Sequence, residues 1–195
     1  MDLMTSLPIP APVASGSELP LLMARVASGD RAAFTLLVRH LENPGLRLAD
    51  RTLGERAGAE DVVQVALSRL WTMADRYDPA RGSVEGWFRR IVVNLCLDRR
   101  RAVRSLVPID AVAETASDAP DPLESALLAD RKARLVVAME KLLPRQRAAL
   151  AMFHGEGMSM AEIAQTLETT PKAVEGLLGR ARIELKALIG PIGDE

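Results

Sequence analysis

The stretch from residue 158 to residue 188 most constrains what this chain can fold into, because it predicts two helices joined by a tight turn. The first spans Ser159 to Leu167, and the second begins at Thr170, a helix-capping hydroxyl residue, followed by Pro171 at the first helical position. This arrangement is a helix-turn-helix, whose second helix enters a DNA major groove. We therefore expect a gene-regulatory protein. The apolar residues that recur with helical spacing are Met160, Ile163, Ala164 and Leu167, then Val174, Leu177, Leu178, Ala181, Leu185 and Leu188.

The charge of the chain narrows how it can bind DNA. Its 195 residues, enough for one or two small domains, carry a net charge of −1. Because phosphate contacts dominate non-specific DNA affinity, a neutral chain needs clustered basic residues or a partner that contributes DNA affinity. The single cysteine, Cys96, cannot form an internal disulfide, which fits a reducing cytosol. No apolar run approaches the roughly 20 residues of a membrane span, so we expect a cytoplasmic protein with no membrane contact.

Helical periodicity divides the chain into two domains and shows no sustained strand-like alternation. Residues 1–19, rich in Pro, Ala and Ser, are expected to be a disordered tail. Residues 20–104 read as one helical domain, with a break at Asn43-Pro44-Gly45 after which a new helix begins. Residues 105–129 are acidic and contain prolines, which is typical of a linker. Residues 130–190 form a second helical domain, so the sequence predicts an all-α fold with two domains.

An amphipathic helix is predicted from residue 59 to residue 76. Asp61, Gln64 and Ser68 fall on its polar face. This face is either a solvated surface or an acidic docking surface for a basic partner. The opposite, apolar stripe consists of Val63, Ala66, Leu67, Leu70 and Trp71.

A loop over residues 77–82 and a capping Ser83 precede a long helix that reaches about Arg104. Its polar side combines arginine, asparagine and tryptophan, which neutralise phosphate, pair with base edges and stack on an unpaired base. The alternative is a basic surface helix with Trp87 in the core. The polar side carries Trp87, Arg90, Asn94, Asp98 and Arg101, and the apolar side Phe88, Ile91, Val92, Leu95 and Cys96.

The sequence contains little that is typical of an enzyme. His40 and His154 have no metal-ligating partner at a useful spacing. Neither a phosphate-binding glycine-rich loop nor a nucleophile elbow is present. We therefore expect a non-enzymatic protein with no catalytic residue, metal or cofactor.

These pieces, taken in order over about residues 20 to 190, resemble the extracytoplasmic-function (ECF) group of bacterial RNA polymerase sigma factors in the sigma-70 family. Region two of that family is similar to AEDVVQ followed by LSRLW and YDPARGSVEGWFRRIVVNLCLDRRR. Region four is similar to LPRQRAALAMFHGEGMSMAEIAQTL followed by VEGLLGRAR. The order and spacing of the motifs carry more weight than any one of them.

The resemblance implies a role for each segment in transcription initiation. Region two would bind the clamp helices of the polymerase β′ subunit through Asp61, Gln64 and Ser68, and would open and read the promoter −10 element. The loop over residues 77–83 would capture a flipped base, and the acidic linker would thread toward the RNA exit path. Core polymerase would then supply much of the DNA affinity. The −10 residues implied are Trp87, Arg90, Asn94, Asp98, Arg99, Arg100 and Arg101.

Region four would bind the polymerase β flap and read the −35 element with the helix from Pro171. An anti-sigma factor that covers the polymerase-binding faces is the usual control in this family. The −35 residues implied are Thr170, Lys172, Glu175, Gly176, Gly179, Arg180 and Arg182.

The chain departs from the family at two surfaces. Val65 stands where the family usually has an acidic residue. In the recognition helix, Glu175, Leu177 and Gly179 stand where lysine, arginine and a polar residue are usual. A glycine inside a helix costs about 1 kcal/mol relative to alanine. The two glycines of this helix fit close backbone approach to DNA, readout of DNA shape or a surface for a protein partner.

Two alternatives to the sigma factor remain open at this stage. One is a helix-turn-helix regulator that binds duplex DNA without polymerase, which would need its own basic surface or a dimer. The other is a protein-binding adaptor that has lost promoter reading. Promoter-specific transcription with added core polymerase separates the three.

Overall fold

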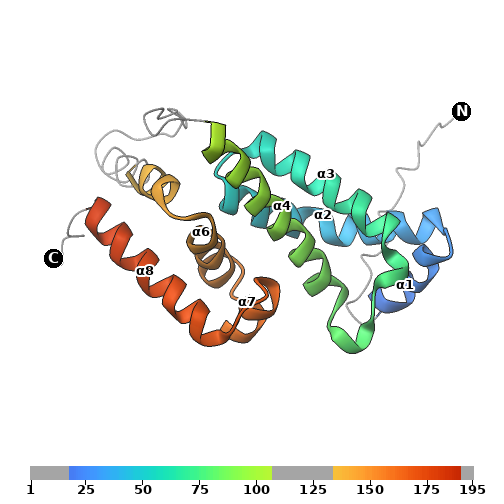
Figure 1. The fold of residues 1–195 in the computed structure, drawn as a ribbon. Coiled ribbons are helices and arrows are strands. Elements are labelled where there is room, and N and C mark those ends of the chain that lie inside the picture. Colours follow the sequence, from blue (N-terminus) through green and yellow to red (C-terminus); the bar gives the residue numbers. More distant parts are fainter. Residues whose placement is uncertain (1–17, 107–133, 190–195) are drawn as a thin grey trace, which may run out of the picture.

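The computed structural model describes residues 18–106 and 134–189, and every regular element in these two ranges is helical (Figure 1). We call them the N-terminal part and the C-terminal part. The all-α fold is confirmed, whereas the tail and the acidic linker lie outside the described residues except at their edges. The N-terminal part contains α1 (Leu19–Ala27), α2 (Arg31–Leu53), α3 (Arg56–Thr72), the 3₁₀ turns η1 (Ala74–Arg76) and η2 (Pro79–Arg81), and α4 (Val84–Leu106). The C-terminal part contains a helix over residues 134–141, α6 (Pro144–Leu150), its π-helical continuation η3 (Ala151–Gly155), α7 (Met160–Thr166) and α8 (Pro171–Ile189).

Helix α2 is continuous, so the predicted break at Asn43-Pro44-Gly45 is wrong. A proline inside a helix removes one backbone hydrogen bond and crowds the preceding turn. Packing on both sides of the proline outweighs that cost, since Leu41 and Leu48 are buried. Gly45 is buried as well, and a Cβ there would lie 2.9 Å from Cε1 of Phe88. The glycine therefore allows α2 to approach α4 closely.

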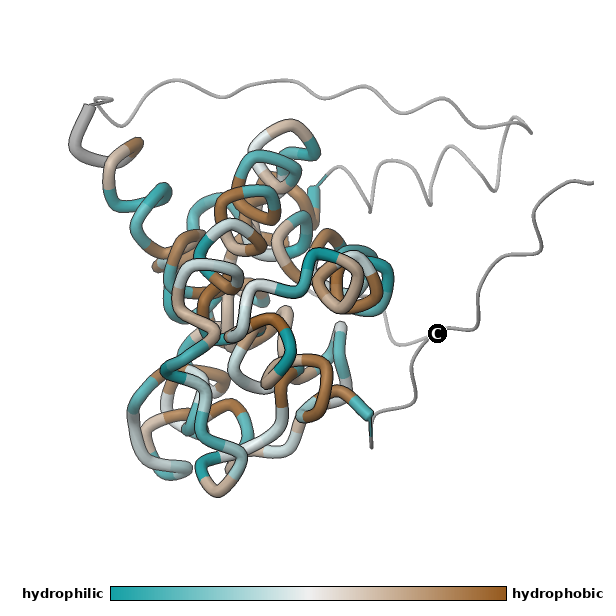
Figure 2. The backbone as a smooth tube through the Cα atoms, turned by 90° about the vertical axis from the view of Figure 1, so that its right-hand side faces the viewer, coloured by the Kyte–Doolittle hydropathy of each residue, from teal (hydrophilic) through white to brown (hydrophobic). Residues whose placement is uncertain are grey.

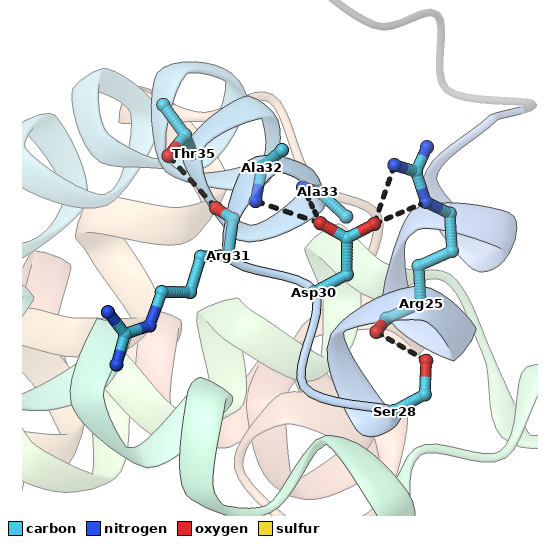
Figure 3. Close-up of polar contacts among 7 residues, drawn as sticks. All are labelled: Arg25, Ser28, Asp30, Arg31, Ala32, Ala33 and Thr35. Atoms are coloured by element: carbon cyan, nitrogen blue, oxygen red, sulfur yellow. Dashed lines mark hydrogen bonds and ion pairs between the residues drawn. The ribbon is translucent and has the colours of Figure 1, made fainter.

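The corner between α1 and α2 is fixed by Asp30 (Figure 3). Its carboxylate accepts hydrogen bonds from the backbone N–H groups of Ala32 (2.9 Å) and Ala33 (3.1 Å), as an N-cap does. The other carboxylate oxygen accepts two hydrogen bonds from Arg25, at 2.9 and 2.6 Å. The backbone hydrogen bond from Ala33 and the ion pair with Arg25 lower the pKa of Asp30. The carboxylate therefore holds the end of α1 to the start of α2.

The helices of the N-terminal part enclose an aliphatic core. Helix α2 packs against α1, α3 and α4, and α3 packs against α4. The apolar stripes predicted for α3 and α4 face inward, and Leu70 and Phe88 are almost fully buried. Colours alternate between hydrophilic and hydrophobic along the helices, as the predicted periodicity requires (Figure 2). The fold thereby leaves the polar faces of α3 and α4 on the outside.

The predicted helix-turn-helix is formed by α7 and α8. Ser159 accepts a hydrogen bond from the backbone N–H of Glu162 (3.3 Å), and the Glu162 carboxylate accepts one from the Ser159 N–H (2.8 Å). These reciprocal bonds are a capping box. Thr170 caps α8 by accepting from the N–H of Ala173 at 3.2 Å. The apolar faces meet at Ile163 and other buried residues, but Leu188, predicted to belong to this face, is 43% exposed.

The two parts of the chain pack directly against each other. Helix α4 contacts α6 and α7, and α2 contacts α6 and η3. Figure 1 shows α6 and α7 beside α4, with α8 on the far side of them. Within residues 18–106 and 134–189, no helix has the length and apolarity needed to span a bilayer.

Candidate functional site

The polar face of α3 is an open surface, as predicted. Asp61, Gln64 and Ser68 are exposed and lie within one stripe of the helix. The side chain of Asp61 is 67% exposed. Val65 lies in the same stripe and is 45% exposed, so it presents an apolar contact between polar neighbours. The stripe therefore combines one carboxylate, one amide and an accessible valine.

Arg99 of α4 connects this stripe to the helix behind it. Its guanidinium lies 3.1 Å from Oε1 of Glu55 and 3.4 Å from Oδ2 of Asp61. Gly58 leaves room for this bridge, because a Cβ there would lie 3.0 Å from Nε of Arg99. The sequence placed Arg99 among the residues expected to bind the −10 element. In the structure it lies beside Asp61, one of the residues expected to bind core polymerase. At about 100° per residue, it is half a turn around α4 from Arg90.

The outer face of α4 presents three of the predicted DNA-binding side chains together. Asn94, Asp98 and Arg101 are exposed. Arg101 and Asp98 form an ion pair with 3.5 Å between Nη1 and Oδ1. The carboxylate therefore orients the arginine, while the amide of Asn94 is open to solvent. Such a face can offer one amide for base edges and one guanidinium for phosphate.

A cavity of about 270 Å³ lies at the start of α4. Trp87 and Arg90 line it and are half-buried. The Trp87 ring lies 5.8 Å from the ring of Tyr77, whose hydroxyl donates to the carbonyl of Gly82 (3.1 Å) and closes the loop. Burial, Glu85 and Asp78 raise the pKa of Tyr77, so the phenol stays neutral. The cavity is lined by Arg76, Tyr77, Asp78, Arg81, Gly82, Ser83, Gly86, Trp87, Arg89, Arg90, Met158, Glu162, Gln165 and Thr166.

Sequence reasoning missed Arg76 and Arg89 as members of this site. Both line the cavity with Arg81 and Arg90, so four arginines and two aromatic residues line one hollow. This composition suits a nucleotide with its phosphate. A basic residue immediately before the predicted loop was the available signal for Arg76.

Arg100 lies apart from the other predicted DNA-binding residues. It donates hydrogen bonds to the carbonyl of Leu53 (3.0 Å), at the end of α2, and to the carbonyl of Glu140 (3.2 Å). Its side chain therefore joins α4 to α2 and to the C-terminal part.

The outer face of helix α8 lacks side chains at two positions, Gly176 and Gly179. Lys172 and Glu175 are exposed at its start. A Cβ added at Gly176 would meet only the flexible end of Arg180, at 3.8 Å, and one at Gly179 would meet nothing within 4 Å. Both glycines thus open onto space. Ile183 is 72% exposed and lies in line with Gly176 and Gly179 along the helix. The exposed Arg180 and Arg182 lie on either side of this glycine strip.

No group of three or more His, Cys, Asp or Glu side chains in the described ranges could hold a metal ion. Cys96 is fully buried, and burial raises the pKa of its thiol to about 12, so it stays protonated. His40 lies 3.4 Å from Glu85 and joins α2 to α4. Cys96 is thus part of the hydrophobic core, and His40 helps to hold α2 against α4.

Two family models match the chain in the order expected from the sequence. Sigma-70 region 2 matches residues 37–105, and Sigma-70, region 4 matches residues 132–185. The first match includes α3 and all but the last residue of α4, and the second includes α7 and most of α8.

Two relatives and one solved structure extend this similarity over most of the chain. The ECF RNA polymerase sigma factor SigM of Mycobacterium tuberculosis is 35% identical over 89% of this chain and 85% of its own length. SigE of Mycolicibacterium smegmatis is 34% identical over 82% of this chain, which spans 64% of that longer protein. The structure of CnrH in complex with the cytosolic domain of CnrY is similar with a TM-score of 0.61 and 29% identity. This match covers 87% of this chain and 96% of CnrH.

Proposed function

Because the chain belongs to the ECF group of sigma-70 family RNA polymerase sigma factors, which are initiation factors rather than enzymes, we propose that three of its surfaces share the work of promoter recognition. The stripe on α3 binds core polymerase, the outer face of α4 reads the −10 element, and α8 reads the −35 element. All three act in the cytoplasm, where core polymerase is found.

The α3 stripe docks on the clamp helices of the polymerase β′ subunit. Its open Asp61, Gln64 and Ser68 carry this proposal, since a carboxylate flanked by neutral polar groups suits a basic partner surface. Val65 adds an apolar contact in place of the acidic residue usual in the family. The Arg99 bridge restrains the Asp61 carboxylate before docking, which lowers the entropy lost when the complex forms.

The outer face of α4 and the adjoining cavity act on the melted −10 strand. Asn94 reads a base edge, and Arg101, oriented by Asp98, contacts phosphate. Trp87 and Tyr77 receive an unpaired base in the cavity, whose arginines neutralise the adjoining phosphates.

Helix α8 reads the −35 element with a backbone that approaches DNA closely at Gly176 and Gly179. Arg180 and Arg182 contact phosphates on either side of that strip. The C-terminal part also binds the polymerase β flap. An anti-sigma factor controls the chain, a proposal supported by the similar structure of CnrH, which is held in a complex with CnrY.

Replacement of Asp61 by arginine tests the assignment of the polymerase surface. We expect Asp61→Arg to weaken binding to core polymerase by 1 kcal/mol or more, on the order of a lost interfacial charge pair. Titration of labelled protein with core polymerase measures this, and helix content is followed by circular dichroism. Exposed substitutions usually change stability by about 0.5 kcal/mol or less, so the fold should survive.

Glu42→Arg is the matched control, since Glu42 is an exposed carboxylate on α2, away from the α3 stripe. Its core affinity should match that of the natural protein. Equal affinity in Asp61→Arg and the natural protein would remove the stripe from the polymerase interface. Specific binding to promoter duplex DNA in the absence of core polymerase would instead favour a polymerase-independent regulator.

A further inference from the structure

The first turn of α6 contains a fully buried glutamine, although glutamine is mostly exposed in folded proteins. Gln146 is 0% exposed. Its Oε1 accepts a hydrogen bond from the backbone N–H of Leu143 at 2.7 Å, and its Nε2 donates one to Oε1 of Glu184 at 2.8 Å. A backbone N–H only donates and an ionised carboxylate only accepts, so these partners fix which way the amide points. The amide therefore joins the start of α6 to α8.

Glu184 lies at the edge of the buried face of α8. It is half-buried and follows the buried Ala181 by about one turn. A carboxylate that has lost part of its hydration is stabilised by a hydrogen bond, which Gln146 supplies. An apolar contact tolerates a small rotation of the helix, whereas a hydrogen bond requires a narrow range of distance and angle. The pair therefore restrains the rotation of α8 about its own axis.

The residue before this glutamine makes a second contact, with the turn of the helix-turn-helix. Nη2 of Arg145 donates a hydrogen bond to the carbonyl of Leu167 at 2.7 Å. Leu167 is the C-cap of α7. Carbonyls at the end of a helix lack intrahelical donors and carry partial negative charge, which a guanidinium complements. Two adjacent residues of α6 thus hold both ends of the motif.

The backbone of the turn itself is strained. Glu168 has φ of 51°, and it is the one non-glycine residue with positive φ in the described ranges. This left-handed conformation costs free energy for a residue with a Cβ, and it persists where the surrounding structure fixes it. The hydrogen bond from Arg145 to the preceding carbonyl is such a restraint. The angle between α7 and α8 is therefore held from α6 as well as by the turn.

We call Arg145 and Gln146, with the groups that they contact, the α6 bracket. One contact lies just before α8 begins, and the other lies at Glu184, about 20 Å further along at 1.5 Å per residue. Gly176 and Gly179 lie between the two. A helix held near both ends cannot rock about either one, so the bracket gives the glycine strip a fixed direction.

A fixed direction matters more for this helix than for one with long side chains. A long side chain can change rotamer to reach a base, whereas a backbone cannot. We propose that the α6 bracket positions α8 for reading the −35 element, with Gln146 and Glu184 as positioning residues that face α6 and not DNA. The role in reading rests on the proposed function of α8, whereas the restraint of α8 does not.

Exchanging the donor and the acceptor tests the bracket. In Gln146→Glu, one oxygen can still accept from the N–H of Leu143, but the other faces the carboxylate of Glu184 and repels it. Adding Glu184→Gln restores the hydrogen bond in the opposite direction. Glu184→Gln alone is the matched control, because Gln146 can still donate to the amide oxygen of the new side chain.

The orientation of α8 can be measured without DNA or polymerase. Ala161 on α7 and Ala187 on α8 are exposed, so cysteines introduced there can carry nitroxide labels. The natural Cys96 is buried, and its raised pKa keeps the thiol protonated and unreactive. In pulsed electron paramagnetic resonance, the distribution of label distances should broaden about twofold in Gln146→Glu, because like charges repel across the pair. It should return to the natural width in the double variant and stay there in Glu184→Gln.

Transcription by the full chain with core polymerase measures the consequence for promoters. The ratio of transcripts from promoters with and without a −35 element should fall about tenfold in Gln146→Glu, since a binding surface needs accurate positioning. The ratio should recover in the double variant. Transcription from the promoter without a −35 element should stay unchanged in all three variants, whereas a general loss of structure would lower both transcripts alike.

An unchanged distance distribution in Gln146→Glu, or a double variant as broad as the single one, would overturn the restraint. A broadened distribution with an unchanged ratio would overturn its role in reading. Should Gln146→Glu lose helix content, Glu184→Leu takes its place, because this half-buried site tolerates an apolar side chain and the acceptor is still removed. The same outcomes then decide.

A variant on the glycine strip separates failure of the bracket from failure of the proposed function. A fully active Gly176→Leu would show that α8 does not read the −35 element with this strip. An inactive Gly176→Leu together with an unchanged ratio in Gln146→Glu would overturn the bracket alone.

Discussion

Helices α4 and α8 are both assigned to DNA, yet they are built in opposite ways. The outer face of α4 carries an amide and an ion-paired arginine, at Asn94 and Arg101. The outer side of α8 carries two glycines, Gly176 and Gly179, and the exposed Ile183. The first is suited to hydrogen bonds with bases and phosphates. The second is suited to close contact by the backbone, and we propose that its specificity would depend on the shape of the DNA.

The surroundings of the two helices differ as well. Helix α4 packs against α1, α2, α3, α6 and α7, whereas α8 packs mainly against α6 and α7. Several arginines of α4 are consequently used inside the protein, as Arg99 and Arg100 show. Among the described residues, a Cβ added at Gly179 on the outer side of α8 would have no neighbour within 4 Å, and one at Gly176 would meet only Arg180 of the same helix. Substitutions on α8 should therefore report on DNA binding with little effect on folding, and substitutions on α4 need controls for both.

The largest expected effect is at Gly176. We predict that Gly176→Leu abolishes −35-dependent transcription, because a bulky side chain would hold the backbone away from DNA. Helix content should be retained, since the site is open and leucine is a better helix former by roughly 0.5–1 kcal/mol. In vitro transcription from promoters with and without a −35 element measures the loss.

The matched control for Gly176→Leu is Ala187→Leu, an exposed site about three turns further along α8. Recognition helices contact bases mainly through their N-terminal residues, so this variant should stay active. If Gly176→Leu is fully active, the glycines do not face DNA, and the contrast between α4 and α8 needs another cause, such as a protein partner for α8.

A smaller effect is expected on α4, where two residues should act differently. Asn94→Ala should lower transcription about tenfold and relax the −10 sequence preference, because a base contact is worth about 1–3 kcal/mol. Arg101→Ala should weaken opening for every sequence and reduce the salt slope by about one. Transcription from a set of −10 variants at several salt concentrations separates the two.

Equal loss of sequence preference in both variants would contradict this division of roles. Arg101→Ala also frees the Asp98 carboxylate, which then repels phosphate. The double replacement of Asp98 and Arg101 by alanine should therefore be less impaired than Arg101→Ala alone.

Periodicity was enough to predict most of this fold. The apolar stripes around Phe88 and Ile163, and the caps at Ser83 and Thr170, are found as expected. Pro44 was misleading, because local propensity takes no account of the packing that keeps α2 intact. Helical periodicity and capping depend on residues close together in the chain, so they can be recognised in a single sequence.

The relations between the two parts could not be predicted in the same way. Arg147 looks like any solvated residue of an amphipathic helix, and only the left-handed Gly54 nearly a hundred residues earlier makes its burial possible. Helical spacing alone could have separated Arg99 from the −10 face. Its partner Asp61 required the packing of α3 on α4.

The smallest expected effect concerns α7, which lies between the two reading helices. Ser159→Ala removes the cap and should lower stability by about 1 kcal/mol, or roughly 2–4 °C in melting temperature. Hydrogen bonds from the backbone and hydroxyl of Ser159 lower the pKa of Glu162 below its usual 4.5. The ionised Glu162 carboxylate therefore contributes fully to folding stability above pH 4.5, and this contribution is lost as the pH falls through the lowered pKa.

Glu162→Gln is the matched variant, because glutamine completes a capping box without titrating in this range. The natural protein should lose melting temperature more steeply than Glu162→Gln as the pH falls below 4.5, and the two should run parallel above it. Parallel curves down to pH 3 would show that the box does not hold the carboxylate ionised. If Ser159→Ala impairs −35 reading but not −10 melting, α7 positions α8 without an effect on α4.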